Sequence, residues 1–156
     1  MRVKDIIRKN NLVIQVGRST CGPCSLLNVL RLKGDMSGTE DEFAEICKTR
    51  DGVGTANEDM VTAAEEVGLN VLEAKAGGTA AEVKRHIDND AYVIVNYFHT
   101  FSGHGHYAVI TDYDDNAFYL ADCSLGFLRL RNEYFEKYWY GADPGSESKK
   151  WFLAVS

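Results

Sequence analysis

The order of helical and strand patterns along this 156-residue chain predicts an α+β fold, with a helical N-terminal half packed on a C-terminal antiparallel β-sheet. Apolar residues in the first half recur at the three- and four-residue spacing of amphipathic helices. The second half instead contains short β-branched and aromatic runs separated by turn residues. No low-complexity linker or repeat interrupts the chain, so residues 1–156 are expected to form a single domain.

The first half carries several signals for helix starts and ends. Pro23 fits the first turn of a helix that begins at Cys21, because the amide proton that proline lacks has no partner there. Gly34 is suited to end that helix, Thr39 opens a capping box for the next one, and Asn57 is the expected cap of a third. The predicted helices cover residues 1–10, 21–33, 39–49, 57–67 and 79–87, with an extended segment at 12–16 and a strand at 71–74.

The second half reads as strands. The β-branched and aromatic runs cover residues 91–97, 107–113, 117–121, 127–130 and 151–155, and a short helix is expected at 132–140. The turn-forming sequence Asp114-Asp115-Asn116 separates two of these runs, which therefore pair as a hairpin.

The composition restricts the classes of partner. The chain is 45% hydrophobic and 26% charged, and its net charge of −6 argues against binding to a nucleic-acid backbone, which usually needs a basic patch. No apolar run approaches the roughly 18 residues of a membrane span, and the N-terminal residues contain no signal-peptide core. We therefore expect a cytoplasmic protein without a membrane span, whose four cysteines are reduced thiols.

Cys21 is the first candidate for chemistry. A cysteine nucleophile reacts as a thiolate, which backbone N–H groups and the dipole at a helix N-terminus stabilise. Cys21 stands at the start of the strongest predicted helix, so its position meets that requirement. Gln15 ends the extended segment six residues earlier and could place a side-chain amide beside the Cys21 backbone N–H, as a second donor to an oxyanion.

A base and its orienting group are expected on the strands. His106 opens one strand of the predicted hairpin, and Asp122 follows the end of the other. An antiparallel hairpin brings the start of one strand beside the end of its neighbour, so the two side chains can meet although sixteen residues separate them. Each residue alone is more commonly a surface or turn residue, but Gln15, Cys21, His106 and Asp122 together favour cysteine catalysis.

The same residues carry a family resemblance. The stretch Gln15-Val-Gly-Arg-Ser-Thr-Cys21-Gly-Pro-Cys-Ser-Leu resembles the beginning of the bacteriocin-processing, double-glycine-leader peptidase family, whose members place a Gln, five residues and then Cys-Gly before a long helix. Later stretches resemble that family's second half in order and spacing: Tyr92-Val-Ile-Val, His106-Tyr-Ala-Val-Ile, Tyr113-Asp-Asp and Leu120-Ala-Asp122.

This resemblance covers almost the whole chain and implies a papain-like fold and a cysteine peptidase that acts on a peptide or protein substrate. It implies Cys21 as nucleophile, His106 as base, Asp122 as its orienting group and Gln15 in the oxyanion hole, with no cofactor and no metal. Such peptidases are usually domains of peptide exporters. This chain has neither the membrane spans nor the nucleotide-binding motif of an exporter, so we expect a stand-alone relative, for which leader cleavage is one possible role.

Two positions depart from the family pattern. Cys123 follows Asp122, where the family commonly has proline, and position 24 is a second cysteine instead of a small inert residue. We expect Cys24, Cys47 and Cys123 to be packing residues, since free cysteines are often buried. His104 could replace His106 as the base, but His106 directly abuts the apolar strand. His86 on a helix and His99 in a loop have no evident partner.

Other functions remain open. Cys21-Gly-Pro-Cys24 is also the tetrapeptide of thioredoxins, which would exchange disulfides. Against this reading, Thr20 stands where thioredoxins have tryptophan, no proline occurs between Pro23 and Pro144, and strands do not alternate with helices. A zinc site of Cys21, Cys24, His104 and His106 is a weaker alternative, because His-Gly-His on a strand lacks the usual ligand spacing. A related acyl transferase, or a pseudopeptidase that binds peptides without cutting them, would use the same cleft.

Overall fold

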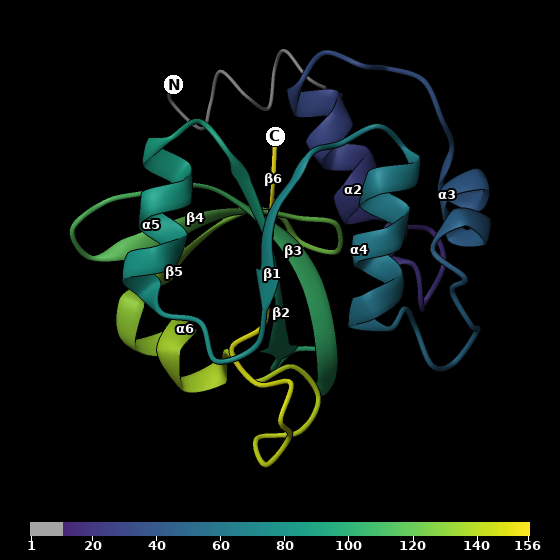
Figure 1. Cartoon of the computed structure of the whole chain (residues 1–156). Helices are drawn as coiled ribbons and strands as arrows, with labels where there is room; N and C mark the ends of the chain where they lie inside the picture. The colour runs from purple at the N-terminus through teal and green to yellow at the C-terminus, as the bar shows by residue number, and fades with distance from the viewer. Residues whose placement is uncertain (1–10) are drawn as a thin grey trace.

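The computed structural model describes residues 11–156, so the helix predicted at 1–10 lies outside the described residues. A six-stranded antiparallel sheet forms the centre, with strand order β1-β6-β2-β3-β4-β5 (Figure 1). The strands are β1 (Val71–Lys75), β2 (Tyr92–His99), β3 (His104–Tyr113), β4 (Ala117–Asp122), β5 (Gly126–Arg131) and β6 (Phe152–Val155). The predicted α+β class is confirmed.

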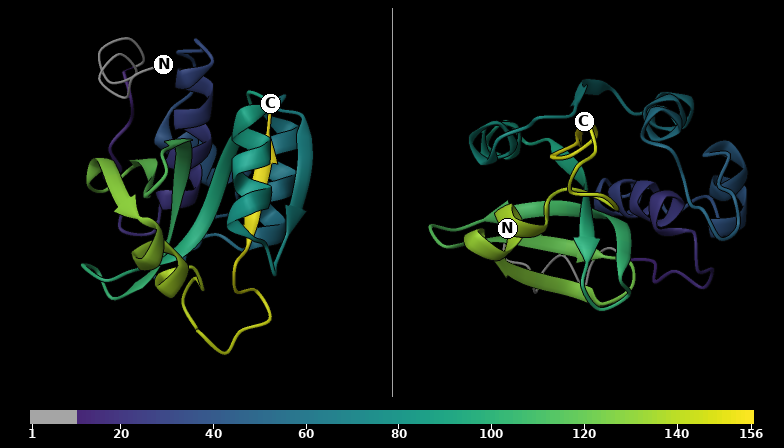
Figure 2. Two further views of the ribbon diagram at one scale, coloured as in Figure 1. Left: turned by 90° about the vertical axis from the view of Figure 1, so that its left-hand side faces the viewer. Right: turned by 90° about the horizontal axis from the view of Figure 1, so that it is seen from below.

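Helices cover both faces of the sheet, as the two further views show (Figure 2). On one side lie α2 (Cys21–Leu32), α3 (Glu40–Ile46) and α4 (Asn57–Glu66), and on the other lie α5 (Ala80–Asp88) and α6 (Asn132–Tyr138). Each side has its own apolar core, because successive residues of a strand point to opposite faces. On β2, for example, Ile94 belongs to the core under α2, whereas Val93 and Val95 belong to the core under α5 and α6.

Among the helices within residues 11–156, α2 is the most enclosed. Cys21 through Arg31 are all buried, and the leucines and valine of this stretch pack on β3 and β4. Pro23 lies in the first turn as predicted, and the Cys24 amide donates to the Thr20 carbonyl, which fixes the entry of the chain into the helix. The nucleophile candidate therefore starts a helix that is held on all sides.

Most predicted elements are present with boundaries shifted by one to three residues. The capping box of Thr39 and Glu42 is present, and Thr79 caps α5 through a bond from the Glu82 amide. The prediction that Asn57 caps α4 was wrong: Ala56 occupies the N-cap position, and the Asn57 amide oxygen instead accepts a hydrogen bond from the Tyr107 hydroxyl on β3.

The hairpin of β3 and β4 positions the candidate site. Val109 pairs with Ala121, so the start of β3 lies beside the end of β4, as predicted. The predicted division into a helical first half and a β-sheet second half is not complete, because β1 from the first half forms one edge of the sheet by pairing with β6.

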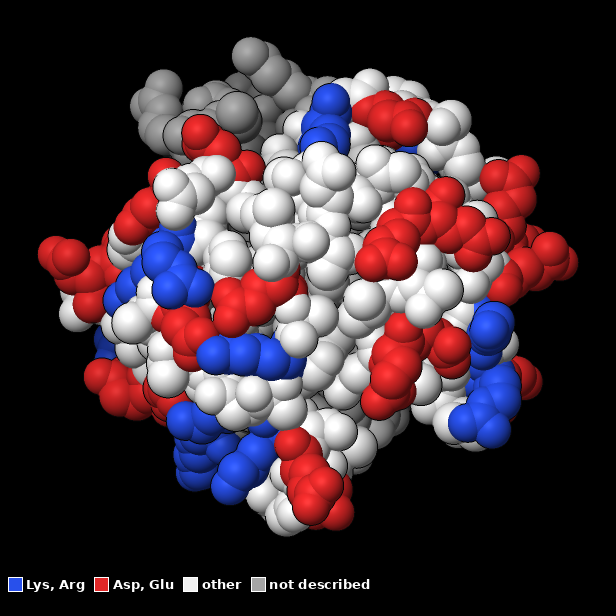
Figure 3. Space-filling view, viewed as in Figure 1, with Lys and Arg blue, Asp and Glu red and all other residues white. Residues whose placement is uncertain are grey.

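The surface carries charges of both signs. On the face shown in Figure 3, carboxylates gather most densely over α3 and α4, and Lys and Arg form small separate groups. Within residues 11–156, no helix is both long and apolar enough to cross a membrane.

Candidate active site

Cys21 is the first residue of α2 and lines a cavity of about 330 Å³. Besides Cys21, its walls come from four parts of the chain: the segment before α2, the loop between α3 and α4, the β2–β3 end of the sheet, and the segment between α6 and β6. The lining residues are Arg18, Ser19, Cys21, Gly52, Val53, Gly54, Thr55, Asn96, His104, Gly105, Tyr107 and Ala142. The cavity therefore gives a ligand access to the N-terminus of the helix that carries the thiol.

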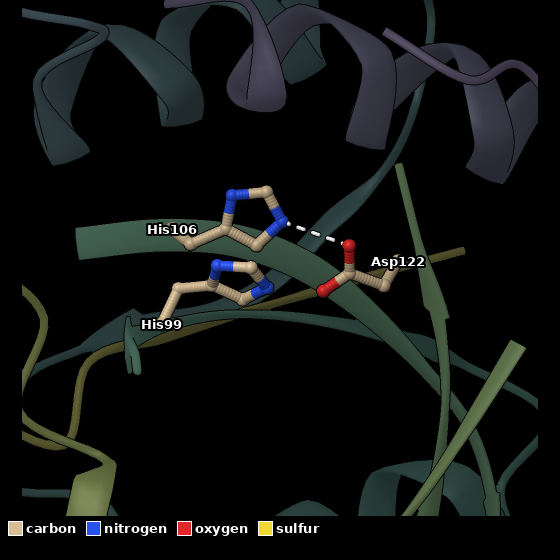
Figure 4. Close-up of side chains that lie close together, drawn as sticks. All are labelled: His99, His106 and Asp122. Carbon is tan, nitrogen blue, oxygen red and sulfur yellow. Dashed lines mark hydrogen bonds and ion pairs between the residues drawn. The ribbon is translucent and has the colours of Figure 1, made fainter. Parts of the chain in front are cut away.

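His106 and Asp122 are brought together as the hairpin predicts. The His106 Nε2 atom lies 3.0 Å from Asp122 Oδ1, and both side chains are almost fully buried (Figure 4). Because the ionised carboxylate can only accept hydrogen bonds, Nε2 carries the proton, and Nδ1 is left for another partner. Burial alone would lower the pKa of His106, but the hydrogen bond to Asp122 and the nearby Cys123 and Cys21 thiols raise it to about 12. The imidazole is thus held by the carboxylate, and the Cys21 thiol lies close enough to affect its charge.

The Asp122 carboxylate is held by four donors. Oδ1 accepts from His106 and from the backbone amides of Ser124 (2.8 Å) and Leu125 (3.1 Å), and Oδ2 accepts from the Tyr97 hydroxyl (2.6 Å). Burial raises the pKa of Asp122, but the hydrogen bonds and the His106 charge outweigh it and lower the pKa to about 2. The carboxylate is therefore ionised at neutral pH and fixed in orientation.

Gln15 lies beside this group, although its amide is not free. Its backbone N–H donates to the Cys123 carbonyl (2.8 Å), and its Oε1 accepts from the Cys123 thiol and the Ser124 hydroxyl, both at 3.2 Å. Nε2 donates to the Gly17 carbonyl (2.8 Å). The side chain is oriented by the turn after β4, and one of its two amide hydrogens is engaged.

Glu40 anchors the segment between Gln15 and Cys21, a role that sequence reasoning missed. Its carboxylate accepts from the backbone amides of Val16 (3.0 Å) and Gly17 (2.9 Å) and from the Thr20 hydroxyl. Burial raises the pKa of Glu40, yet these hydrogen bonds hold it below its usual value. Glu40 lies between the two capping-box residues Thr39 and Glu42, but no sequence signal distinguishes it from other acidic residues in the first turn of a helix.

His99 is part of the site, so its placement in a loop without a partner was wrong. It ends β2, is 4% exposed, and its ring lies against His106 with centroids 4.6 Å apart. Its Nδ1 is bonded to the Ser102 hydroxyl (2.8 Å), but its Nε2 has no hydrogen-bond partner within residues 11–156. His86 also has a partner, Glu73, at 2.6 Å, far along the chain from this group.

The remaining cysteines are buried and reduced in the described structure. Cys24, Cys47 and Cys123 all belong to the core under α2, which agrees with the predicted packing role. Burial, with smaller effects of Cys123 and Glu40, raises the pKa of the Cys24 thiol well above its usual value. A thiol that resists ionisation is poorly suited to disulfide exchange at neutral pH.

The proposed zinc set does not assemble. In the part of the chain that the structure describes, the side chains whose potential metal-binding atoms lie within 4.8 Å of one another are His99, His106 and Asp122. His104 is exposed, and its Nδ1 lies 3.1 Å from the Gly105 carbonyl. The alternative set of Cys21, Cys24, His104 and His106 is absent among these residues.

A thiol at a helix N-terminus, a buried imidazole on an antiparallel sheet and a carboxylate behind it define a papain-like cysteine peptidase. The family comparison agrees with this class. Residues 9–142 match the model of the peptidase C39 family, and the chain belongs to that family. It is therefore a cysteine peptidase, and the thioredoxin-like alternative is set aside.

Individual relatives support the same fold. An uncharacterized protein of Methanothermobacter thermautotrophicus is 34% identical over 134 residues, which cover 83% of each chain. A C39-like peptidase from Bacillus anthracis has a TM-score of 0.70 at 16% identity, covering 94% of this chain and 95% of that one. A double-glycine-motif protease from an AMS/PCAT transporter, solved with its leader peptide, has a TM-score of 0.66 at 17% identity, covering 92% of this chain and 89% of that one.

Proposed function

We propose that this chain hydrolyses peptide bonds with Cys21 as nucleophile, His106 as base and Asp122 as the group that orients the base. The observation that carries the proposal is the position of His106, whose Nε2 is hydrogen-bonded to Asp122 and whose pKa, against the effect of burial, is raised by Asp122 and by the nearby Cys21 thiol. A raised pKa keeps the imidazole protonated, so that it can pair with a thiolate and later give its proton to the leaving amine.

The reaction begins with attack of the Cys21 thiolate on a peptide carbonyl in the adjoining cavity. The Cys21 backbone N–H and the Gln15 amide are proposed to stabilise the oxyanion. Gln15 Nε2 carries two hydrogens, and donation of one to Gly17 leaves the second for the substrate. His106 then protonates the departing amine, and water hydrolyses the thioester with His106 as base.

The residues that line the cavity also suit a particular class of substrate. Gly52, Gly54 and Gly105 line it near Cys21, and walls without side chains allow an extended peptide to approach the backbone closely. A protein of the same fold was solved with a leader peptide. We therefore propose a leader-type peptide with a double-glycine cleavage site as substrate, cut by residues 1–156 acting as one domain.

Labelling with an epoxide probe, which alkylates a thiol and needs a proton for its ring oxygen, tests the Cys21–His106 pair. Labelling of Cys21 should be lost in His106→Ala and kept in His86→Ala, which removes a histidine bonded to Glu73 instead. Unchanged labelling in His106→Ala contradicts the pair.

The peptide substrate requires a separate experiment. A diverse peptide library that includes double-glycine sequences, with products identified by mass spectrometry, should show cleavage that Cys21→Ala abolishes. Transfer of the acyl group to an added amine would indicate a transferase. Labelling of Cys21 with binding but no turnover would indicate a pseudopeptidase.

A further inference from the structure

Two buried histidines face a single buried carboxylate. His106 Nε2 is bonded to Asp122 Oδ1, whereas a ring nitrogen of His99 lies within 4.8 Å of an Asp122 oxygen, and the His99 Nε2 has no hydrogen-bond partner among residues 11–156 (Figure 4). An unpaired polar atom at 4% exposure is costly, so in the tautomer with its proton on Nε2, where Nδ1 accepts from the Ser102 hydroxyl, His99 would gain by taking the carboxylate from His106. Something in the structure must prevent that exchange.

The second oxygen of the Asp122 carboxylate is bonded to the Tyr97 hydroxyl and not to His99. It donates to Asp122 Oδ2 at 2.6 Å, while Oδ1 receives His106 and the two backbone amides of the following turn. Tyr97 is the donor that holds Oδ2 while three donors hold Oδ1, so rotation of the carboxylate toward His99 would break bonds on both oxygens.

The β2–β3 register explains why one tyrosine can do this. Tyr97 is directly opposite His106, and residues opposite each other in antiparallel strands share a face. Its ring meets the His106 ring edge-on at 5.8 Å and the His99 ring edge-on at 5.9 Å. Tyr97 thus touches both competing histidines and the carboxylate between them.

We propose that Tyr97 is a positioning residue that assigns the Asp122 carboxylate to His106 and denies it to His99. This inference rests on the proposed function for its consequence in catalysis, but the hydrogen-bond assignment itself is independent of turnover. Loss of the hydroxyl would let the carboxylate turn toward His99, and His106 would lose its orienting partner.

The test is a double-mutant cycle. Tyr97→Phe should lower kcat for peptide cleavage about 10- to 100-fold with KM changed less than about twofold, the range expected for one hydrogen bond to a charged group. His99→Phe removes the competing nitrogen and keeps a flat ring, so the double variant should recover to within about fivefold of wild type. The matched control is Tyr113→Phe, which removes another tyrosine–aspartate bond, to Asp88 (2.7 Å), on the exposed surface.

Side-chain ¹⁵N NMR of the histidines in Cys21→Ala protein gives a readout without turnover. Adding Tyr97→Phe should move the His99 Nε2 signal toward that of a carboxylate-bonded nitrogen and the His106 signal away from it. This result stands even if the chain cleaves no peptide. Unchanged signals, or a defect that His99→Phe does not relieve, overturn the proposal.

A fluorotyrosine at position 97 covers the case in which Tyr97→Phe does not fold. It preserves the shape of the ring and strengthens the donor, which weakens the carboxylate as an acceptor for His106. We expect the alkaline limb of kcat to move to lower pH, with no movement for the same replacement at Tyr113. An unmoved limb would exclude the role of the hydroxyl.

Discussion

Replacing Asp122 with asparagine removes a charge from the candidate site with little change of shape. The amide oxygen is expected at the Oδ1 position, because the Ser124 and Leu125 backbone amides require an acceptor there. The amide nitrogen then faces Tyr97, whose hydroxyl can rotate to accept instead of donate. His106 Nε2 can still donate to the neutral amide oxygen, but the negative charge beside the imidazole is removed.

The structure sets the size of this loss. The pKa of Asp122 falls from 3.8 to about 2 against the opposing effect of burial, which corresponds to about 2 kcal/mol of net stabilisation of the anion. His106 is the first contributor to that stabilisation, and a hydrogen bond between charged groups is worth about 1.5–3 kcal/mol. Without the charge, the protonated form of His106 should lose a factor of about 10 to 100 relative to the neutral form.

The sign of the pH effect follows from the charge of the imidazolium. The carboxylate raises the pKa of His106, so its removal lowers that pKa, and the base loses its proton at lower pH. Because the pKa of His106 in wild type is raised to about 12, epoxide labelling of Cys21 followed from pH 5 to 11 should show no full alkaline limb in wild type. In Asp122→Asn the limb should move about one to two pH units lower and enter that range. Asp88→Asn, which changes an exposed carboxylate on α5, is the control. If Asp122→Asn shows the same profile as wild type, Asp122 does not sustain the charge of His106.

Further variants test the parts around the triad. Gln15→Ala should reduce kcat about 100-fold while the epoxide still labels Cys21, because an oxyanion donor stabilises the intermediate formed by attack on a peptide carbonyl. Peptide turnover and epoxide labelling, measured on the same variant, separate the two effects. Glu40→Gln should lower the free energy of unfolding by about 1–3 kcal/mol in urea titration, because the loop amides lose a charged acceptor. A thiol reagent should modify Cys21 in the folded protein but Cys24 only after denaturation, and rapid modification of Cys24 in the folded state would contradict its full burial. The depressed pKa of Asp122 stabilises the fold above pH 4, so about 2 kcal/mol should be lost as the pH falls from 4 toward 2, and Asp122→Asn should lack this loss.

The fold could be predicted from local patterns because most helix and strand signals here agree with the tertiary structure. Pro23, the Thr39 capping box and the β-branched runs each specify local geometry that packing preserves. Asn57 was misread because its side chain is used in a long-range contact with Tyr107, and no local signal reveals such a contact. The position of β1 at the sheet edge likewise depends on pairing with a strand about eighty residues later.

The candidate site was predictable to the extent that it lies on a hairpin and a helix start. His106 and Asp122 follow from strand register, and Cys21 follows from the helix. His99 escaped notice because β2 continues two residues beyond the predicted run 91–97, through an extension that the sequence does not mark. Tyr97 lies within that run, but no local signal reveals that its hydroxyl donates to Asp122, twenty-five residues later.

Cys123 stands where the related family commonly has proline, and its contacts show how the site accommodates that change. The thiol donates to Gln15 Oε1 at 3.2 Å and lies 3.6 Å from the Cys21 carbonyl oxygen. Burial raises its pKa to about 11 although the His106 interactions lower it, so the thiol keeps its proton at neutral pH and remains a donor. Proline would preserve the backbone bond from Gln15, because it retains the carbonyl, but it would offer no side-chain donor. In this chain, therefore, the turn that follows β4 holds the orienting acid through its amides and the proposed oxyanion amide through Cys123 and Ser124, which couples the two halves of the site through one short segment.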